Sequence, residues 1–397
     1  MTTVGVLGGG QLGRMLGLAG LPLGLRFRFL DPAEASPAAA VGEHVRGSFD
    51  DPQKLSEFRA GVDVVTYEFE GVPAGTAEAL SSVVPVRPAP GVLRGMQDRL
   101  EQKRFVRSLG IDVASFAPVH DRASLEAALR EVGTPSRLKA RRGGYDGRGQ
   151  ARIDRPEEAT AAWRALGEVP ALLERHVPFR REIAILAVRD TRGAHRLYPL
   201  VETRQSDGVL VRAVAPAPGI DRALRRQAGA IARRILDALD YVGVLAIECF
   251  ELDGRLIVNE LAPRVHNSGH WTTEGAATSQ FENHLRAVVG FPLGSTRARG
   301  VSGLVNLLGD VPERAAVLAV PGTHLHLYGK RPLPGRKLGH VTVRAAGHGQ
   351  LRDRLRRVES LLPPRTPVAR KEPPAARAVS GLPPAPNRPL AAAEAGA

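Results

Sequence analysis

Residues 138–150 read LKARRGGYDGRGQ, and four of the seven residues from 143 to 149 are glycine. Each glycine loses conformational entropy when it is ordered, so a purely structural turn rarely holds so many. Such a loop can fold over phosphates and donate backbone N–H groups to them, with the ammonium of Lys139 beside the same phosphates. The stretch lacks the Gly-Lys-Ser/Thr ending of a P-loop. It therefore predicts a different type of nucleotide-triphosphate site, with a flexible hairpin as the alternative interpretation.

The segment that follows predicts a hinge against the nucleotide. Residues 172–185 read LLERHVPFRREIAI, an apolar strand ending in a Glu-Arg-His-Val turn whose main chain could bind adenine. Glu182 opens the next strand, where its carboxylate could hold a ribose hydroxyl. Each of these side chains alone would be an ordinary surface residue. The residues in this prediction are Glu174, Arg175, His176, Val177 and Glu182.

Residues 242–264 read VGVLAIECFELDGRLIVNELAPR and predict a β-hairpin that turns at Asp253. A three-residue loop would place Glu248 opposite Glu260, whereas a two-residue turn would oppose Glu248 to Asn259. Two opposed carboxylates repel each other unless a cation lies between them. Mg²⁺ accepts one or two carboxylates together with nucleotide phosphates. The hairpin therefore predicts a magnesium site, with two solvated edge acids as the alternative.

A run of polar side chains follows this hairpin. Arg264 is followed by His266, Asn267 and, after Ser268 and Gly269, by His270. Such donors beside a metal and nucleotide suit a small anion, such as bicarbonate or the phosphorylated intermediate that it forms. For His266 or His270 alone, a structural role bonded to the main chain is an equal alternative.

A second glycine motif lies at the amino terminus. Gly8, Gly10 and Gly13 follow an apolar run and open a helix, and Asp31 ends the next predicted strand. This GxGxxG spacing is typical of dinucleotide sites, although many α/β domains need the same turn. Because Gln11 would also face the anion position, a ribose phosphate is the competing ligand. An NAD-dependent oxidoreductase therefore remains an alternative at this point.

The order of the predicted elements indicates an α/β protein of several domains. Alternating strands and helices predict an N-terminal domain with a parallel sheet over residues 1–95. Mixed α/β sequence predicts a central domain over 96–298, and short strands predict a small β-rich domain over 299–362. Residues 363–397 contain nine prolines, and we expect this tail to be disordered.

Composition limits the functional classes. Of 397 residues only Cys249 is a cysteine, which excludes an internal disulfide framework and is typical of the cytoplasm. From the sequence we expect neither a signal peptide nor a membrane-spanning segment. Its net charge is +14, but the basic residues are scattered and only 5% of residues are aromatic, so we expect phosphate-bearing substrates rather than nucleic acid. Only six of the basic residues are lysine, and four of these lie in segments with a predicted functional motif.

Taken together, the motifs resemble one family. GGGQLGRM (8–15), QDRLEQK (97–103), GGYDGRGQ (143–150), AIECF (246–250), NELAPRVHNSGHW (259–271), SQFE (279–282) and PGRKLGH (334–340) are similar to the N5-carboxyaminoimidazole ribonucleotide synthases of the ATP-grasp superfamily. The resemblance implies a Rossmann-like pre-ATP-grasp domain, a central ATP-grasp domain and a small C-terminal β-rich domain. It also implies ATP-dependent carboxylation of aminoimidazole ribonucleotide with bicarbonate, Mg²⁺ as cofactor, and a homodimer. Another ATP-grasp ligase with a different amine acceptor is the nearest alternative.

Residue roles follow from the same resemblance. It implies that ATP is bound by Arg99, Lys139, Gly144, Tyr145, Asp146, Gly147, Arg148, Gly149, Gln150, Glu174, Arg175, His176, Val177, Glu182, Gln205, Asn259 and Glu260. Glu248 and Glu260 would hold Mg²⁺, and Arg264, His266, Asn267 and Lys139 would be catalytic. The substrate would contact Gln11, Tyr145, Asp146, Lys330, Arg336 and Lys337. Gln205 departs from the family, since a histidine usually occupies that position, and a glutamine cannot become a cation.

Overall fold

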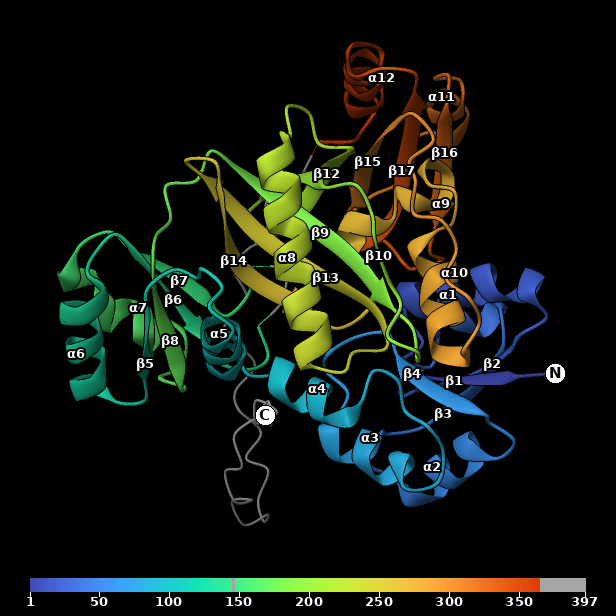
Figure 1. Ribbon diagram of the computed structural model, residues 1–397, viewed down its shortest axis with the longest axis horizontal. Helices are drawn as coiled ribbons and strands as arrows, with labels where there is room; N and C mark the ends of the chain where they lie inside the picture. Colours follow the sequence, from blue (N-terminus) through green and yellow to red (C-terminus); the bar gives the residue numbers. More distant parts are fainter. Residues whose placement is uncertain (145–146, 365–397) are drawn as a thin grey trace, which may run out of the picture.

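Three β-sheets form the framework of this computed structural model, which describes residues 1–144 and 147–364 (Figure 1). The expected α/β class is confirmed. Tyr145, Asp146 and the predicted disordered tail from residue 365 onward lie outside the described residues. No described helix is long and apolar enough to cross a membrane.

The N-terminal sheet has four parallel strands in the order β3-β2-β1-β4. All five residues of β1 are buried, as expected when both faces of a parallel sheet are covered. The elements are β1 (Thr3–Leu7), α1 (Gln11–Gly20), β2 (Arg26–Asp31), β3 (Glu43–Arg46), α2 (Pro52–Arg59), β4 (Val64–Tyr67), α3 (Ala74–Ser81) and α4 (Pro90–Met96), with 3-10 turns at Leu21–Leu23 and Pro37–Ala40.

A small antiparallel sheet follows, in the order β5-β8-β6-β7. Its inner face packs on α6 and α7 around Trp163 and Leu173. This sheet carries Lys139 and the second glycine loop, residues 143–149, which connects β6 to β7. The elements are α5 (Arg99–Ser108), β5 (Phe116–Val119), α6 (Arg122–Val132), β6 (Ser136–Ala140), β7 (Gln150–Ile153), α7 (Ala159–Ala165) and β8 (Ala171–Arg175), with a 3-10 turn at Pro156–Glu158.

The central sheet has nine strands and includes the C-terminal part of the chain. Its order is β14-β13-β9-β11-β12-β15-β17-β16, with β10 on β9, so the predicted C-terminal β-rich region extends this sheet through β12 and β15. Its elements are β9 (Arg181–Arg189), β10 (His195–Leu197), β11 (Val201–Ser206), β12 (Val209–Ala215), α8 (Arg222–Ala238), β13 (Gly243–Leu252), β14 (Arg255–Ala262), a 3-10 turn (Asn267–Gly269), α9 (Thr272–Gly275), α10 (Gln280–Val289), β15 (Val301–Leu308), α11 (Arg314–Leu318), β16 (Thr323–Leu327), β17 (Lys337–Ala345) and α12 (His348–Ser360).

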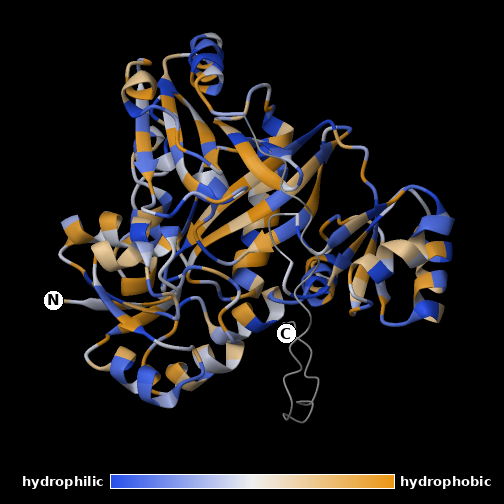
Figure 2. Ribbon diagram, turned by 180° about the vertical axis from the view of Figure 1, so that it is seen from behind, coloured by the Kyte–Doolittle hydropathy of each residue, from blue (hydrophilic) through white to orange (hydrophobic). Residues whose placement is uncertain are grey.

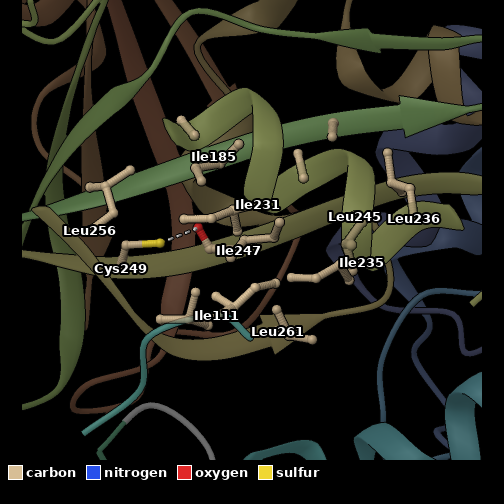
Figure 3. Close-up of a cluster of buried hydrophobic side chains, with 14 of the residues drawn as sticks. Ile111, Ile185, Ile231, Ile235, Leu236, Leu245, Ile247, Cys249, Leu256 and Leu261 are labelled. Atoms are coloured by element: carbon tan, nitrogen blue, oxygen red, sulfur yellow. Dashed lines mark hydrogen bonds between the residues drawn. The ribbon is translucent and has the colours of Figure 1, made fainter. Parts of the chain in front are cut away.

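Helix α8 covers one face of the central sheet. Ile231 and Ile235, four residues apart, lie on one side of the helix and are buried against Leu245 and Ile247 of β13 (Figure 3). Burying each of these side chains contributes about 1.5–3 kcal/mol. In Figure 2 hydrophobic residues are frequent along the strands, whereas the outer helices carry both hydrophobic and hydrophilic residues. This packing fixes β13, which carries one of the predicted metal ligands.

His284 of α10 joins the N-terminal sheet to the central sheet. Its Nδ1 accepts a hydrogen bond from the backbone N–H of Val244 (3.1 Å), so Nε2 carries the proton and donates to Thr66 Oγ1 (2.9 Å). The ring is fully buried. Burial lowers the pKa of His284 to about 4, which keeps the imidazole neutral.

Candidate functional site

The turn of the β13–β14 hairpin differs from the prediction. Leu252 pairs with Arg255, so the loop is the two residues Asp253 and Gly254, and the expected three-residue loop is wrong. Both loop residues have positive φ angles, 49° and 73°. A two-residue turn of this kind matches the right-handed twist of the flanking strands, which explains why it forms here.

A β-bulge nevertheless places the two carboxylates opposite each other. Cys249 faces Val258, the register then shifts, and Glu248 faces Glu260. Asn259 is the extra residue on the bulged strand. The predicted opposition of Glu248 and Glu260 is therefore confirmed, but it depends on a bulge that the turn alone does not imply.

Burial and two neighbouring carboxylates raise the proton affinity of Glu248. Burial, Glu260 and Glu182 together raise the pKa of Glu248 to about 8. His266 Nε2 lies 3.6 Å from Glu248 Oε1. Because His266 Nδ1 accepts from the backbone N–H of Ser268 (3.3 Å), the neutral ring carries its proton on Nε2, toward the carboxylate.

These residues fit a magnesium ion that is completed by a ligand. Among the described residues no three His, Cys, Asp or Glu side chains cluster tightly enough to hold a metal by themselves. When Mg²⁺ binds together with nucleotide phosphates, the protein typically provides one or two carboxylate ligands, and phosphate oxygens and water molecules provide the other ligands. The donor set thus suits a metal that arrives with a nucleotide.

A buried ion cluster lies beside the carboxylate pair. Glu174 Oε2 lies 2.6 Å from Lys139 Nζ, and its Oε1 lies 3.1 Å from Lys103 Nζ. Burial alone would raise the pKa of Glu174, but Lys103 and Lys139 outweigh it and lower the pKa to about 2. Lys139 also donates to Asn259 Oδ1 (3.1 Å), which ties β6 to the bulge in β14. No role was predicted for Lys103, although its place in the QDRLEQK motif and the scarcity of lysine point to one.

The predicted adenine hinge is partly used within the protein. The backbone N–H of Arg175 donates to Ser115 O (2.8 Å), and that of His176 donates to Pro135 O (2.9 Å). The carbonyl of Val177 accepts from a nearby backbone N–H. A base bound at this turn would therefore have to use other main-chain groups.

Arg99, at the start of α5, holds the second glycine loop. It donates to the carbonyls of Ala140 (2.9 Å) and Gly144 (2.8 Å), and its guanidinium lies 3.7 Å from Glu260. Gly147 has a φ of 75°, and a Cβ there would lie 2.4 Å from the carbonyl oxygen of Asp207. Only glycine fits this contact between the loop and the β11–β12 hairpin. Arg148 and Gly149 belong to the same loop, and Gln150 begins β7 opposite Lys139.

The β11–β12 hairpin also carries Gln205. The residue follows a register shift after Arg204 and pairs with Leu210. Its backbone N–H bonds Glu182, the second residue of β9. Burial raises the pKa of Glu182 to about 7, and Arg137 offsets this only in part. Gln205 and Glu182 therefore share one local network.

The predicted bicarbonate residues lie next to the carboxylate pair. Arg264 Nε donates to Glu70 Oε2 of the N-terminal sheet region (2.8 Å). Asn267 is buried, and neither polar atom of its amide has a hydrogen-bond partner among the described residues. Unpaired buried polar groups are costly, so this amide suits a polar ligand.

Gln280 of α10 positions His266, and the sequence indicates it only as part of the SQFE motif. Its Oε1 accepts from His266 N (3.0 Å), and its Nε2 donates to His266 O (2.7 Å). The same Nε2 lies 3.2 Å from His270 Nδ1. A Cβ at Gly269 would lie 2.4 Å from Gln280 Oε1, which explains the glycine.

His270 itself belongs to a packed aromatic stack. Its ring centroid lies 4.8 Å from that of His340, which lies 4.5 Å from that of His326. The structural interpretation therefore fits His270, whereas His266 lies beside Glu248.

The predicted substrate residues come from three segments. Lys330 donates to Gln11 Oε1 at the start of α1, which brings two of them together. Lys337, the first residue of β17, is close enough to Glu248 to lower its pKa, against the larger effects of burial and Glu260. Arg336 is exposed and donates to Arg331 O (3.3 Å). Tyr145 and Asp146 lie outside the described residues.

The N-terminal glycine loop, residues 8–13, is filled by the protein's own carboxylates. Glu68 accepts from the backbone N–H groups of Gly10 and of Gly13 (2.6 Å). Asp31 accepts from Gly9 N (2.7 Å), so it is not free for a ribose hydroxyl. The backbone N–H groups that would bind a pyrophosphate and the carboxylate that would bind a ribose are therefore already engaged, which argues against a dinucleotide site.

Three family models match the chain in succession. They are the ribonucleotide synthetase preATP-grasp domain over residues 1–97, the ATP-grasp domain over 104–281 and the phosphoribosylaminoimidazole carboxylase C-terminal domain over 302–354. The three-part fold that the sequence predicted is confirmed by these matches.

Known proteins resemble the chain along most of its length. N5-carboxyaminoimidazole ribonucleotide synthase of Pseudomonas aeruginosa is 50% identical over 90% of this chain and 99% of its own. The crystal structure of the synthetase from Thermus thermophilus superimposes with a TM-score of 0.87 at 52% identity, covering 90% of this chain and 98% of that one. The Aspergillus clavatus enzyme, in complex with ADP and 5-aminoimidazole ribonucleotide, gives a TM-score of 0.85 at 33% identity, covering 91% and 98%. The chain belongs to the N5-carboxyaminoimidazole ribonucleotide synthase family of ATP-grasp enzymes.

Proposed function

We propose that this chain uses ATP and bicarbonate to carboxylate 5-aminoimidazole ribonucleotide on its exocyclic amine, releasing ADP and phosphate. The observation that carries the proposal is the opposition of Glu248 and Glu260 beside the Lys103–Glu174–Lys139 cluster. The similarity of the whole chain to synthases of this reaction supports it. So does the family member whose structure holds ADP and 5-aminoimidazole ribonucleotide.

In the first step, an oxygen of bicarbonate attacks the γ-phosphate of ATP to form carboxyphosphate and ADP. Such a transfer is accelerated mainly by positioning and by charges that offset the developing negative charge. Lys139 and Arg99 supply fixed positive charge next to the second glycine loop. A bound magnesium ion, held by Glu248 and Glu260, would supply the remaining charge neutralisation.

In the second step, the amine of the substrate forms a C–N bond to the carboxyl carbon of carboxyphosphate, or of the CO₂ that it releases. The C–O bond to phosphate breaks, and the departing phosphate takes up the proton that the amine loses. Arg264 and the Asn267 amide would hold the anion, and the Nε2–H of His266 would donate a hydrogen bond to it. Lys330 and Gln11 would contact the ribonucleotide, with Arg336 and Lys337 near its phosphate. The second glycine loop would exclude water, because the intermediate hydrolyses readily.

The test is ADP release with 5-aminoimidazole ribonucleotide and bicarbonate, each omitted in turn. We expect full turnover only with both and with Mg²⁺, and formation of the carboxyamino product. ADP release that ignores the ribonucleotide, or turnover with a different amine, would point to another ATP-grasp ligase. A change in absorbance at 340 nm with a nicotinamide cofactor would support the oxidoreductase alternative instead.

We also propose that the chain acts as a homodimer in the cytoplasm. The family resemblance supports the dimer, and the lone buried thiol of Cys249 is compatible with a reducing compartment. Light scattering of the purified protein should give twice the mass of one 42.4 kDa chain. A monomer mass at micromolar concentration would refute the dimer without affecting the proposed reaction.

A further inference from the structure

Three arginines converge on a pocket in the C-terminal region, away from the site described above. Arg299 precedes β15, Arg344 lies near the end of β17, and Arg354 lies on α12. They line a pocket of about 480 Å³ together with Gln350 and the backbone at Gly322. Figure 1 shows α12 beside β15 and β17 at one extremity of the molecule.

The pocket and the candidate active site lie at opposite ends of the same strand. Lys337 begins β17 on the active-site side, and Arg344 lies seven residues further along this strand. At roughly 3.3 Å per residue, an extended strand of that length spans about 23 Å. A ligand in the pocket is therefore a separate ligand from the nucleotide and the ribonucleotide.

Most N–H donors of the three guanidinium groups are not used in hydrogen bonds within the described residues. Arg299 donates to Ala277 O (3.3 Å), Arg344 donates to Arg299 O (3.4 Å), and Arg354 donates to Arg344 O. These acceptors are main-chain carbonyls, and within residues 1–144 and 147–364 no carboxylate pairs with any of the three. Each guanidinium has five N–H donors, and the Nε of Arg344 is buried without an acceptor. An unsatisfied buried donor is unfavourable.

The acidic residues nearby are engaged elsewhere. On α12, Asp353 pairs with Arg356 and Glu359 pairs with Arg212. Gln350 Oε1 is the acceptor of the Ala346 N–H. The pocket thus gathers like charges without a counter-charge from the described protein, an arrangement that raises the local affinity for anions.

We propose that this arginine pocket binds the phosphate group of a small phosphorylated ligand. Guanidinium forks match phosphate oxygens in pairs, which a lysine or a neutral donor does not achieve. The pocket is open to solvent and wider than one phosphate, which leaves room for an organic group attached to the phosphate. The bound phosphate supplies the missing negative charge and acceptors for the solvent-facing N–H groups of the three guanidiniums.

Inorganic phosphate is the probe, and Arg354→Gln is the main variant. Arg352→Gln is the matched control, because Arg352 is exposed on the same helix and does not line the pocket. Calorimetric titration would be run at constant ionic strength, with ADP and Mg²⁺ saturating the nucleotide site. We expect Arg354→Gln to weaken phosphate binding at least tenfold, Arg352→Gln to leave it within twofold, and both to retain the wild-type rate of ADP release.

Arg299→Gln provides a second variant, since Arg299 is exposed and Arg354 also supports the carbonyl of Arg344. Crystals soaked in tungstate should show an anomalous peak among the three guanidinium groups in wild type and not in Arg299→Gln. Equal phosphate affinity in wild type, Arg299→Gln and Arg354→Gln would overturn the proposal. The proposal would also be overturned if the tungstate peak lay only at another place, or if the protein bound an oligonucleotide but not phosphate.

Discussion

The two glycine loops look alike in sequence but have different contacts. Both follow a strand, and both could present backbone N–H groups to an anion. In the N-terminal loop these groups donate to Glu68 and Asp31, which are the protein's own carboxylates. The second loop is equally rich in glycine, but its neighbours are the cations Arg99 and Lys139. The first loop is therefore internally neutralised, whereas the second is surrounded by positive charge that suits phosphates.

A glycine motif therefore defines only the backbone of an anion site. What occupies the site depends on a residue remote in sequence, since Glu68 lies 58 residues from Gly10. A motif search that considers only the loop cannot distinguish the two cases. Mutations in and around the two loops can test whether this contrast explains both stability and activity.

The largest effect is expected beside the second loop. Glu260→Ala or Lys139→Ala should each lower the rate of ADP formation by about 10³-fold or more, because the transferred phosphoryl group loses a charge partner. Glu260→Ala should not lower the melting temperature measured without Mg²⁺, since it removes one of two facing carboxylates. Glu57→Gln, a change in an exposed residue of α2, is the control. A near wild-type rate in either site variant would refute the assignment of the site.

The next largest effect concerns His284, which joins the N-terminal sheet to the central sheet. The pKa of His284 falls from 6.5 to about 4 on folding because the ring is buried. The unfolded chain therefore binds the proton more readily, and stability is lost as pH falls from about 6.5 toward 4. His284 should account for about 3 kcal/mol of that loss between pH 7 and pH 4.

Urea unfolding of wild type and His284→Gln at pH 7 and at pH 4 measures how much of the stability loss is due to His284. The variant should lose about 3 kcal/mol less than wild type on acidification, whatever its stability at pH 7. His120→Gln, on the surface, should match the wild-type loss. Equal losses in wild type and His284→Gln would mean that the buried ring does not drive acid unfolding.

A smaller loss of stability is expected in the N-terminal loop. Glu68→Gln keeps one acceptor oxygen but turns an amide NH₂ toward a backbone N–H, which leaves a donor unsatisfied. Burial raises the pKa of Glu68, so removing its charge recovers part of this cost. We expect a net loss of about 1–3 kcal/mol in denaturant unfolding. Glu43 forms an ion pair with Arg28 at the surface, and Glu43→Gln should change stability by much less.

Local patterns predicted the elements better than their contacts. The apolar runs of β1 and β13 consist of consecutive residues, and the structure contains both strands. The opposition of Glu248 and Glu260 was predicted with the wrong turn, because a bulge cannot be inferred from hairpin length. The pairing of β12 with β15 joins Arg212 to Val305, and no local signal indicates it.

The same limit applies within the site. Lys139, Arg99 and the second glycine loop were predicted from their motifs, and the structure brings them together. The roles of Gln280 and Lys103 became visible only from their hydrogen bonds to His266 and Glu174. Such contacts join distant segments, and a single sequence does not record which segments meet.

The smallest effect is expected at Gln205, on the hairpin that contacts the second loop. Related synthases are expected to have a histidine here, and an imidazolium would add a cation near the nucleotide. Gln205→His should therefore lower the KM for ATP by about fivefold or less, equivalent to roughly 1 kcal/mol. The gain should be larger at pH 6 than at pH 8, because only the protonated ring is charged.

Gln205→Asn separates charge from hydrogen bonding, since it retains an amide without adding a cation. Glu182, whose pKa is raised to about 7, titrates over the same pH range but is common to all three proteins. Its contribution therefore cancels when the pH profiles are compared. A KM that falls equally at pH 6 and pH 8 would show that shape rather than charge matters at this position. An unchanged KM would mean that the hairpin contacts the loop backbone, through Gly147 and Gly208, without reaching the nucleotide.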